Sequence, residues 1–277
     1  MKKKALKIAA LAAAAVLIAG VGAFANSLVG NPVSRALAAG TAKKHLAKNY
    51  AGTDFFVQDI SFSFKDGNYY AHIKSPSSID RYFSLCISMG GRLVRDSYSD
   101  VMSGSNTARR LNEAYRELAG TVLESPVFPY PGEIAFGDLA FIPREYAGAE
   151  DVPSYALIEE DLETDKLYDI PGLGERAGHL VIYVDDETVS AGRAAEIMLE
   201  ISRLMEEGGV PFYAMDFVLQ RPRGEDDRRP EGRVEVRQFL RADIYEEGME
   251  ERVRAANDAQ LAYYAAQDAE KALQAGK

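Results

Sequence analysis

The stretch FVQDISFSFKDGNYYAHI, residues 56–73, decides the fold of the first half of the chain. Between Phe56 and Phe64, apolar side chains recur on one face with a period of two, which is typical of a half-buried β-strand. Residues 65–68, Lys-Asp-Gly-Asn, supply the positive-φ positions that a tight hairpin needs. We therefore expect residues 69–73 to return as an antiparallel strand.

Two more strands extend this hairpin into a sheet. Residues 82–89 alternate large apolar side chains with small or polar ones, and Gly90-Gly91 turns the chain into a strand over residues 93–97. The four strands are predicted to form an antiparallel meander.

A helix is predicted on each side of the meander. Asn31-Pro32 with Ser34 marks the start of one helix, which runs to about Lys48. Asn106 or Thr107 caps the other helix, whose apolar stripe consists of Leu111, Ala114, Tyr115, Leu118 and Val122. Residues 26–124 are therefore predicted to form an α-ββββ-α domain.

A proline-dense segment separates this domain from a second one. Residues 125–133 contain three prolines, which lack the amide hydrogen that helices and strands require, so this segment is interpreted as a linker. Residues 134–277 are predicted to form an α+β domain with a β-α-β-β-α core. Its expected elements are strands over 134–142, 180–184, 213–220 and 234–244, a helix with an apolar stripe from Ala194 to Met205, a loop over 221–232 and a final helix from about Glu246.

The N-terminal 25 residues have the pattern of an export signal or a membrane anchor. Four lysines within the first seven residues precede an uncharged run from Ile8 to Ala25, which is long enough to cross a bilayer core. If this segment is retained, the sequence predicts a single-pass protein of the cell membrane with its C-terminal part extracytoplasmic. The alternative is secretion after cleavage following Ala25, since Ala23-Phe24-Ala25 fits signal peptidase. The predicted fold class is α+β: an N-terminal membrane helix over residues 1–25, then two small α+β domains with mainly antiparallel sheets.

Composition narrows the classes of partner. The formal net charge is −10, although the only charged side chains of residues 1–25 are four lysines. The rest of the chain is therefore strongly acidic, and nucleic acid is not an expected partner. The single cysteine, Cys86, excludes an intramolecular disulfide.

No motif in the chain completes a cofactor or metal site. Gly172 to Gly178 imitates a dinucleotide-binding loop but follows Ile170-Pro171 instead of a strand, so it is interpreted as a turn or helical cap. The possible zinc ligands His45, His72, His179 and Cys86 have no paired spacing. The acidic residues Glu159, Glu160, Asp161, Asp165, Asp169, Asp185, Asp186 and Glu187 lack the spacing of a calcium loop. We predict no cofactor and no metal.

The sequence neither establishes nor excludes two kinds of catalytic site, a cysteine–histidine pair and a pair of carboxylates. Cys86 and His72 could face the same way on neighbouring strands, although an acylating thiol also needs a lowered pKa and an oriented base. Paired carboxylates of the glycosidase type cannot be found from spacing alone. No catalytic residue is assigned.

The N-terminal segment and eight further segments together resemble the YfjL-like proteins of Gram-positive bacteria. The eight segments are Asn31-Pro32-Val33-Ser34, Ala42-Lys43-Lys44-His45-Leu46, residues 64–73, Ser75-Pro76-Ser77-Ser78, Gly178-His179-Leu180, residues 209–214, Phe217-Val218-Leu219 and residues 243–248. The resemblance implies a membrane-anchored envelope protein with two small α+β domains, and it implies no activity. The helix-plus-meander order also resembles PepSY and cystatin modules, which is an analogy of fold alone.

These observations favour a non-catalytic module of the cell envelope that binds a peptide or protein partner. The alternative is a secreted or anchored hydrolase that uses two carboxylates. The predicted partners are the membrane, through the N-terminal helix, and an envelope protein or peptide.

Overall fold

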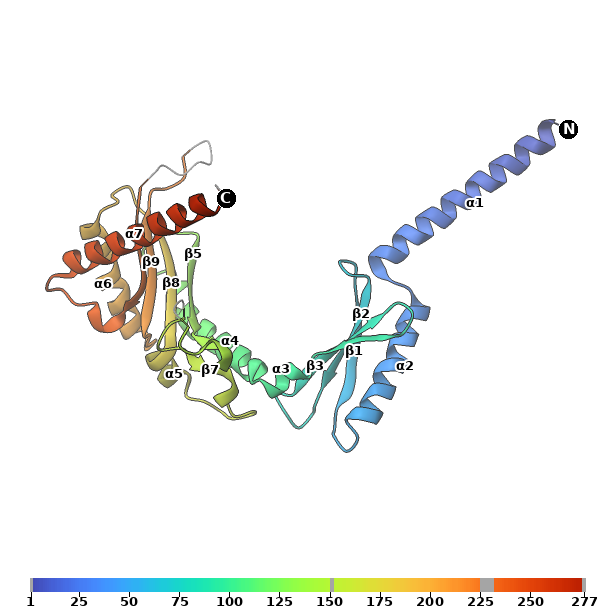
Figure 1. The fold of residues 1–277 in the computed structure, drawn as a ribbon, viewed down its shortest axis with the longest axis horizontal. Coiled ribbons are helices and arrows are strands. Elements are labelled where there is room, and N and C mark those ends of the chain that lie inside the picture. The colour runs from blue at the N-terminus through green and yellow to red at the C-terminus, as the bar shows by residue number, and fades with distance from the viewer. Residues whose placement is uncertain (1, 150–151, 225–231, 276–277) are drawn as a thin grey trace. The chain divides into compact units, whose positions relative to one another are not determined.

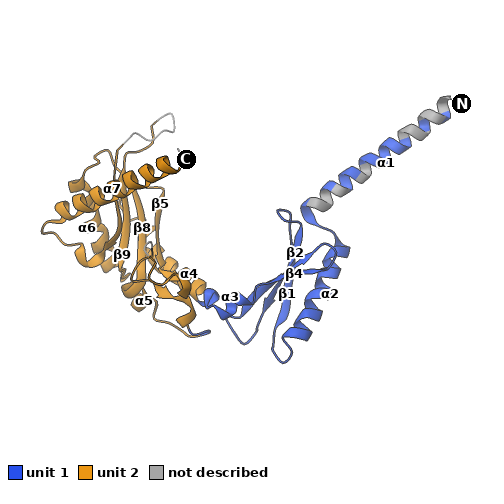
Figure 2. Ribbon diagram, viewed as in Figure 1, with its two compact units in different colours: residues 1–107, 163–165 blue, residues 108–162, 166–277 orange. Residues whose placement is uncertain are grey.

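The computed structural model describes residues 2–149, 152–224 and 232–275 of the chain (Figure 1). The chain divides into two compact units (Figure 2). Unit 1 comprises residues 1–107 and 163–165, and unit 2 comprises residues 108–162 and 166–277. The predicted loop over 221–232 lies largely outside the described residues, which omit 225–231.

Unit 1 contains the predicted meander. Its elements are α1 (Lys2–Val29), α2 (Pro32–Asn49), β1 (Phe56–Ser63), β2 (Asn68–Lys74), β3 (Tyr82–Ser88), β4 (Leu93–Asp96), α3 (Ser99–Met102) and the start of α4 (Ser105–Leu123). The strands pair antiparallel in sequence order, and Phe62 lies opposite Tyr69 as the hairpin pattern requires. Helix α2 covers one face of this sheet, where Ala38 and Ala42 pack against Ala71 and Leu85 in a buried core.

The predicted membrane helix is wrong. The region forms α1, a helix of 28 residues. Among the described residues, however, no helix is both long enough and apolar enough to cross a membrane. The prediction relied on the uncharged length of residues 8–25. Two predictions that depended on this helix are wrong for the same reason. They are the membrane as a partner and a single-pass location at the cell membrane.

A buried polar cluster joins three chain segments of unit 1. The Asp80 carboxylate, in a residue that is 1% exposed, accepts hydrogen bonds from the Thr107 hydroxyl at 2.9 Å and the Asp165 amide at 2.8 Å. In return, Asp165 Oδ1 accepts the Ser78 hydroxyl at 2.7 Å and the amides of Ile79 and Asp80. Asp165 has φ +64°, a left-handed conformation that aspartate tolerates better than most residues. This acidic residue is therefore part of the fold of unit 1.

Unit 2 is a four-stranded sheet with helices packed on it. Its elements are the rest of α4, then β5 (Ile134–Leu139), β6 (Phe141–Ile142), β7 (Leu157–Ile158), α5 (Ile170–Ala177), β8 (Gly178–Asp185), α6 (Ala191–Glu207), β9 (Ala214–Gln220), β10 (Arg233–Leu240) and α7 (Met249–Ala275), with short 3-10 helices at Arg144–Tyr146, Glu159–Asp161 and Arg241–Asp243. The sheet order is β10-β9-β8-β5, and only β8 and β9 pair in parallel within it. The α+β class with mainly antiparallel sheets is confirmed.

Most of α4 belongs to unit 2, whereas the sequence placed the whole helix in the first domain. The reason is its apolar stripe. Ala119 and Val122 pack in one core with Leu180 and Ile197, and Tyr115 packs with Leu139 in a second cluster. A stripe at helical spacing identifies a buried face, but it does not identify the sheet that buries it.

Glycines make room for the Tyr115 ring, which is fully buried. A Cβ atom at Gly174 would lie 2.5 Å from both the ring and the Pro211 carbonyl oxygen, and a Cβ at Gly178 would collide with the Tyr115 hydroxyl. That hydroxyl donates a hydrogen bond to Pro211 O at 2.9 Å. The glycine-rich run at residues 172–178 is thus explained by close packing, and it forms α5 and the start of β8.

This packing predicts a dependence between Gly178 and Tyr115. Gly178→Ala should lower the free energy of unfolding by roughly 1 to 3 kcal/mol, because the added methyl group overpacks the core. In a Tyr115→Phe background the same change should cost less, since the hydroxyl is gone, although the Gly174 carbonyl oxygen at 2.5 Å from the new Cβ remains. Urea unfolding followed by circular dichroism measures both values. The control is Gly120→Ala, where the nearest atom to the new Cβ lies 3.5 Å away; equal costs in both backgrounds would contradict this account.

Candidate functional site

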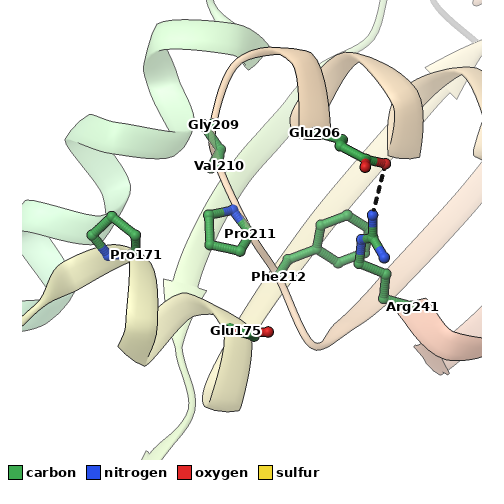
Figure 3. A pocket seen from close by; sticks show the side chains of 8 residues that line it. All are labelled: Pro171, Glu175, Glu206, Gly209, Val210, Pro211, Phe212 and Arg241. Carbon is green, nitrogen blue, oxygen red and sulfur yellow. Dashed lines mark hydrogen bonds and ion pairs between the residues drawn. The ribbon is translucent and has the colours of Figure 1, made fainter.

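Two adjoining cavities in unit 2 form an open groove between α5 and the C-terminal end of α6. The larger cavity, of about 430 Å³, is lined by Pro171, Glu175, Glu206, Gly209, Val210, Pro211, Phe212 and Arg241 (Figure 3). The second, of about 230 Å³, is lined by Glu175, Phe212, Tyr213, Leu240, Arg241 and Ala242. They share Glu175, Phe212 and Arg241, so we treat them as one site and call it the α5/α6 groove.

The floor of the groove is the chain segment 209–213, and its shape follows from how α6 ends. Gly209 has φ +68°, which favours glycine. Its amide donates to Glu206 O and the Val210 amide donates to Met205 O, the pair of hydrogen bonds of a Schellman motif. Pro211 then prevents the helix from continuing.

Hydrogen bonds to neighbouring elements hold this floor in place. Pro211 O accepts the Tyr115 hydroxyl, and the Tyr213 amide donates to Gly178 O at 2.7 Å. Tyr213 O in turn accepts the Arg241 amide at 2.8 Å. Since these backbone groups already have partners, the groove exists before any ligand binds.

One charged pair and one further carboxylate stand at the rim. Glu206 Oε2 lies 3.0 Å from Arg241 Nη2, and the Arg241 guanidinium lies over the Phe212 ring at 5.8 Å (Figure 3). Glu175 projects from α5 on the other side of the cavity and forms no ion pair with any described residue. The Glu206–Arg241 pair has no net charge, so Glu175 makes the groove negative.

Next to the groove, a line of polar side chains crosses the sheet on β8, β9 and β10. Tyr213, at the end of the groove, packs against Tyr155 with the ring centroids 4.7 Å apart and the rings tilted by 37°. The Tyr155 hydroxyl lies 2.5 Å from His179 Nδ1, and His179 Nε2 lies 3.1 Å from Asp216 Oδ1. Arg237 Nη1 contacts the other Asp216 oxygen at 2.7 Å. We call these residues the Tyr155–Asp216 network.

A β-bulge in β10 directs two donors at Asp216. The register with β9 shifts between Val236 and Phe239, and Gln238 within the shift has φ +49°. The Gln238 amide consequently donates to Asp216 Oδ1 at 2.8 Å, beside the Arg237 ion pair. Bulges commonly redirect side chains in this way.

The protonation pattern of the network argues against nucleophilic chemistry. An ionised Asp216 only accepts, so His179 Nε2 carries a proton and Nδ1 accepts from the Tyr155 hydroxyl. Burial, with Asp216 and Tyr213 nearby, raises the pKa of Tyr155 above its usual 10. A phenol with a raised pKa is a poor nucleophile at neutral pH. The contacts of the network fix the positions of Tyr155 and Tyr213.

Cys86 and His72 do lie on the same face of the first sheet, but both ring nitrogens of His72 contact serine hydroxyls. Cys86 is 5% exposed and pairs in register with Tyr70, while His72 pairs with Ser84. The two ring nitrogens of His72 contact the hydroxyls of Ser61 at 3.0 Å and Ser84 at 3.1 Å. The histidine is thus oriented by serines and not toward the thiol.

The other predicted ligand types are also dispersed. His45 binds Asp96 at 2.7 Å in unit 1, and His179 belongs to the network of unit 2. Over the described ranges, no group of three or more His, Cys, Asp or Glu side chains could hold a metal ion. Of the acidic residues, Glu160 and Asp161 bind Arg144, and Asp186 binds Arg193 at 2.9 Å.

Sequence reasoning missed the groove and most of the network. Strand register places Asp216 of β9 and Arg237 of β10 near His179. Tyr155 reaches His179 from the segment between β6 and β7. The one signal available was Gly208-Gly209-Val210-Pro211, a helix end followed by a rigid segment.

The Tyr155–Asp216 network predicts a pH-dependent contribution to stability. Burial acts to raise the pKa of Asp216, but hydrogen bonds from His179, Gln238 and Arg237 outweigh it and lower the pKa below the ordinary 3.8. This contribution is therefore fully present above the unfolded-state pKa and is lost as the pH falls through the folded-state pKa. Asp216→Asn should cost roughly 2 to 4 kcal/mol at about pH 7 and less at about pH 3, where the contribution has begun to fall.

Urea unfolding at the two pH values measures this difference. Asp258→Asn is the matched control, since Asp258 is an exposed aspartate on α7 of the same unit. A cost for Asp216→Asn that is equal at both pH values would show that the carboxylate charge contributes nothing.

Comparison with protein families assigns both halves of the chain. Residues 2–97 match the model described as "YfjL-like, N-terminal domain", and residues 114–254 match the "YfjL-like C-terminal domain". Comparison with curated proteins and with solved structures found no match. The two family matches confirm the resemblance found in the sequence, and the chain belongs to the YfjL-like family.

Proposed function

We propose that this protein is a non-catalytic binding module and that its α5/α6 groove takes a peptide segment of a partner protein. The observation that carries the proposal is the groove itself: two joined cavities over a floor whose backbone groups already have partners. Sites of this kind lose little conformational entropy on binding.

The lining indicates the chemistry of the segment. Val210, Pro211, Phe212 and Leu240 offer apolar contacts, and Leu240 is 36% exposed. Glu175 supplies a carboxylate without an ion pair among the described residues. An apolar side chain beside a lysine or arginine satisfies both features, because the apolar surface leaves water and the cation meets Glu175.

The floor also fits an extended chain. Five consecutive residues, 209–213, contribute to the two cavities, and an extended segment of that length spans about 16 Å. Two joined cavities that follow five consecutive residues favour a peptide segment over a compact small molecule.

A carboxylate-based hydrolase is the second candidate, because Glu175 and Glu206 line the same cavity (Figure 3). A general acid must keep its proton near neutral pH, which burial or a like charge achieves. Glu206 is instead 72% exposed and forms an ion pair with Arg241. Loss of a measured hydrolytic activity in both Glu175→Gln and Glu206→Gln would support this candidate over the first.

A charge-reversal experiment tests the binding proposal. The full chain is incubated with a bead library of random octapeptides, and retained peptides are sequenced. We expect lysine or arginine next to Leu, Ile, Val or Phe among the retained peptides, and Glu175→Lys should shift the preference to aspartate and glutamate. Dissociation constants for the best peptide should rise about tenfold in Glu175→Lys.

Two controls make the result specific. Glu117→Lys introduces the same change of charge at an exposed position of α4 outside the groove, and it should leave the selection unchanged. Leu240→Ser removes an apolar contact of the groove and should weaken peptide binding. Leu261→Ser makes the same substitution at an exposed position of α7, where Leu261 is 54% exposed, and should leave binding unchanged. Recovery of the same peptides by Glu175→Lys and the parent protein would reject the groove as the binding site.

A further inference from the structure

The strand β1 forms a free edge of the first sheet. In the order β1-β2-β3-β4 it pairs only with β2. Alternate N–H and C=O groups of an edge strand point away from the sheet. Among the described residues, the backbone hydrogen bonds of β1 go to β2 and to the turn after Ser63, whose oxygen accepts the Gly67 amide. Alternate residues of this eight-residue strand, which has a β-bulge between Val57 and Asp59, therefore offer backbone donors and acceptors to a further strand.

Helix α2 runs along this edge and leaves a cavity at each end. One, of about 470 Å³, is lined by the C-terminal half of α2, with Lys43 and Leu46, by the connection that follows it and by the start of β1 at Phe56 and Val57. The other, of about 330 Å³, is lined by the junction of α1 and α2, with Arg35, and by the end of β1 at Ile60 and Phe62. Helix and strand are thus antiparallel, and both span about 27 Å. We call the line between them the β1–α2 seam.

The seam is positively charged although the protein is acidic. Helix α2 contains no aspartate or glutamate, and it carries Arg35, Lys43, Lys44 and Lys48. Arg35 and Lys43 line the two cavities, and neither forms an ion pair with a described residue. Pairing of β1 with its counterpart in a second copy would bring two such basic helices together, and their repulsion disfavours that occupant.

We propose that β1 binds an extended segment of a partner protein as an added strand, and that this segment carries acidic and apolar side chains on one face. Arg35 and Lys43 are eight residues apart in α2, a rise of about 12 Å. Four residues of extended chain cover about 13 Å. Acidic residues at positions i and i+4 of the added strand therefore meet the two cations, and an apolar residue at i+2 packs beside Val57 and Ile60. This site is distinct from the α5/α6 groove, and it selects the opposite charge.

The test uses the full chain and a defined probe, the fluorescein-labelled peptide Thr-Thr-Glu-Thr-Val-Thr-Glu-Thr-Thr. Fluorescence anisotropy should show saturable binding. A peptide of identical composition, Thr-Thr-Glu-Glu-Val-Thr-Thr-Thr-Thr, places the acids on opposite faces and should bind at least about tenfold more weakly. The same loss is expected when alternate backbone amides of the first peptide are N-methylated, because an added strand needs those donors.

Protein variants separate the seam from general charge attraction. Arg35→Glu with Lys43→Glu should weaken binding about tenfold, whereas Lys44→Glu with Lys48→Glu changes the net charge equally outside both cavities and should change it less than about threefold. Glu175→Lys should have no effect, which keeps this result independent of the proposed function. Circular dichroism confirms folding of each variant.

Several outcomes would overturn the proposal. They are absence of saturable binding, equal binding of the N-methylated peptide by the parent protein, and equal loss in both pairs of variants. Sedimentation of the chain as a dimer that the peptide cannot dissociate would assign the edge to a second copy.

Discussion

The first unit depends on the burial of one carboxylate, that of Asp80. A buried charge is unfavourable unless hydrogen bonds replace its water shell. Here the replacements come from Thr107 and from the Asp165 amide, while the Asn106 side chain donates to the Asp80 carbonyl at 2.9 Å. The donors belong to two segments of the chain and Asp80 to a third, so the connection between β2 and β3, the start of α4 and the segment 163–165 must assemble together.

The second unit depends on close packing around an aromatic ring. Gly174 and Gly178 admit Tyr115, and the Tyr115 hydroxyl anchors Pro211 at the floor of the α5/α6 groove. The same contact therefore links the core of unit 2 to its surface. A groove supported in this way is rigid because its floor is an extension of the core. The Tyr155–Asp216 network supports the neighbouring Tyr213 by a comparable chain of contacts, of which the Asp216 carboxylate is the charged centre.

Local patterns predicted most elements, and long-range contacts explain what they missed. The hairpin at residues 56–73 was predictable because alternation and turn residues lie within one short stretch. The helix ending at Gly208-Gly209 was predictable from its stripe and its cap. In contrast, Asp165 looked like one of many surface acids, since its role depends on Asp80, which lies 85 residues earlier. The partners of His179 were hidden for the same reason, and the prediction of a membrane helix relied on uncharged length.

Residues 163–165 belong to unit 1, although the residues on both sides of them belong to unit 2. This arrangement limits how recombination could exchange the first unit between proteins. A gene segment that ends after Thr107 would encode every strand of the first sheet but not the Asp165 amide that donates a hydrogen bond to the Asp80 carboxylate. Exchange of this unit between proteins at a single junction would leave a buried carboxylate short of a donor. The two units, although separately compact, are therefore expected to be inherited as a pair.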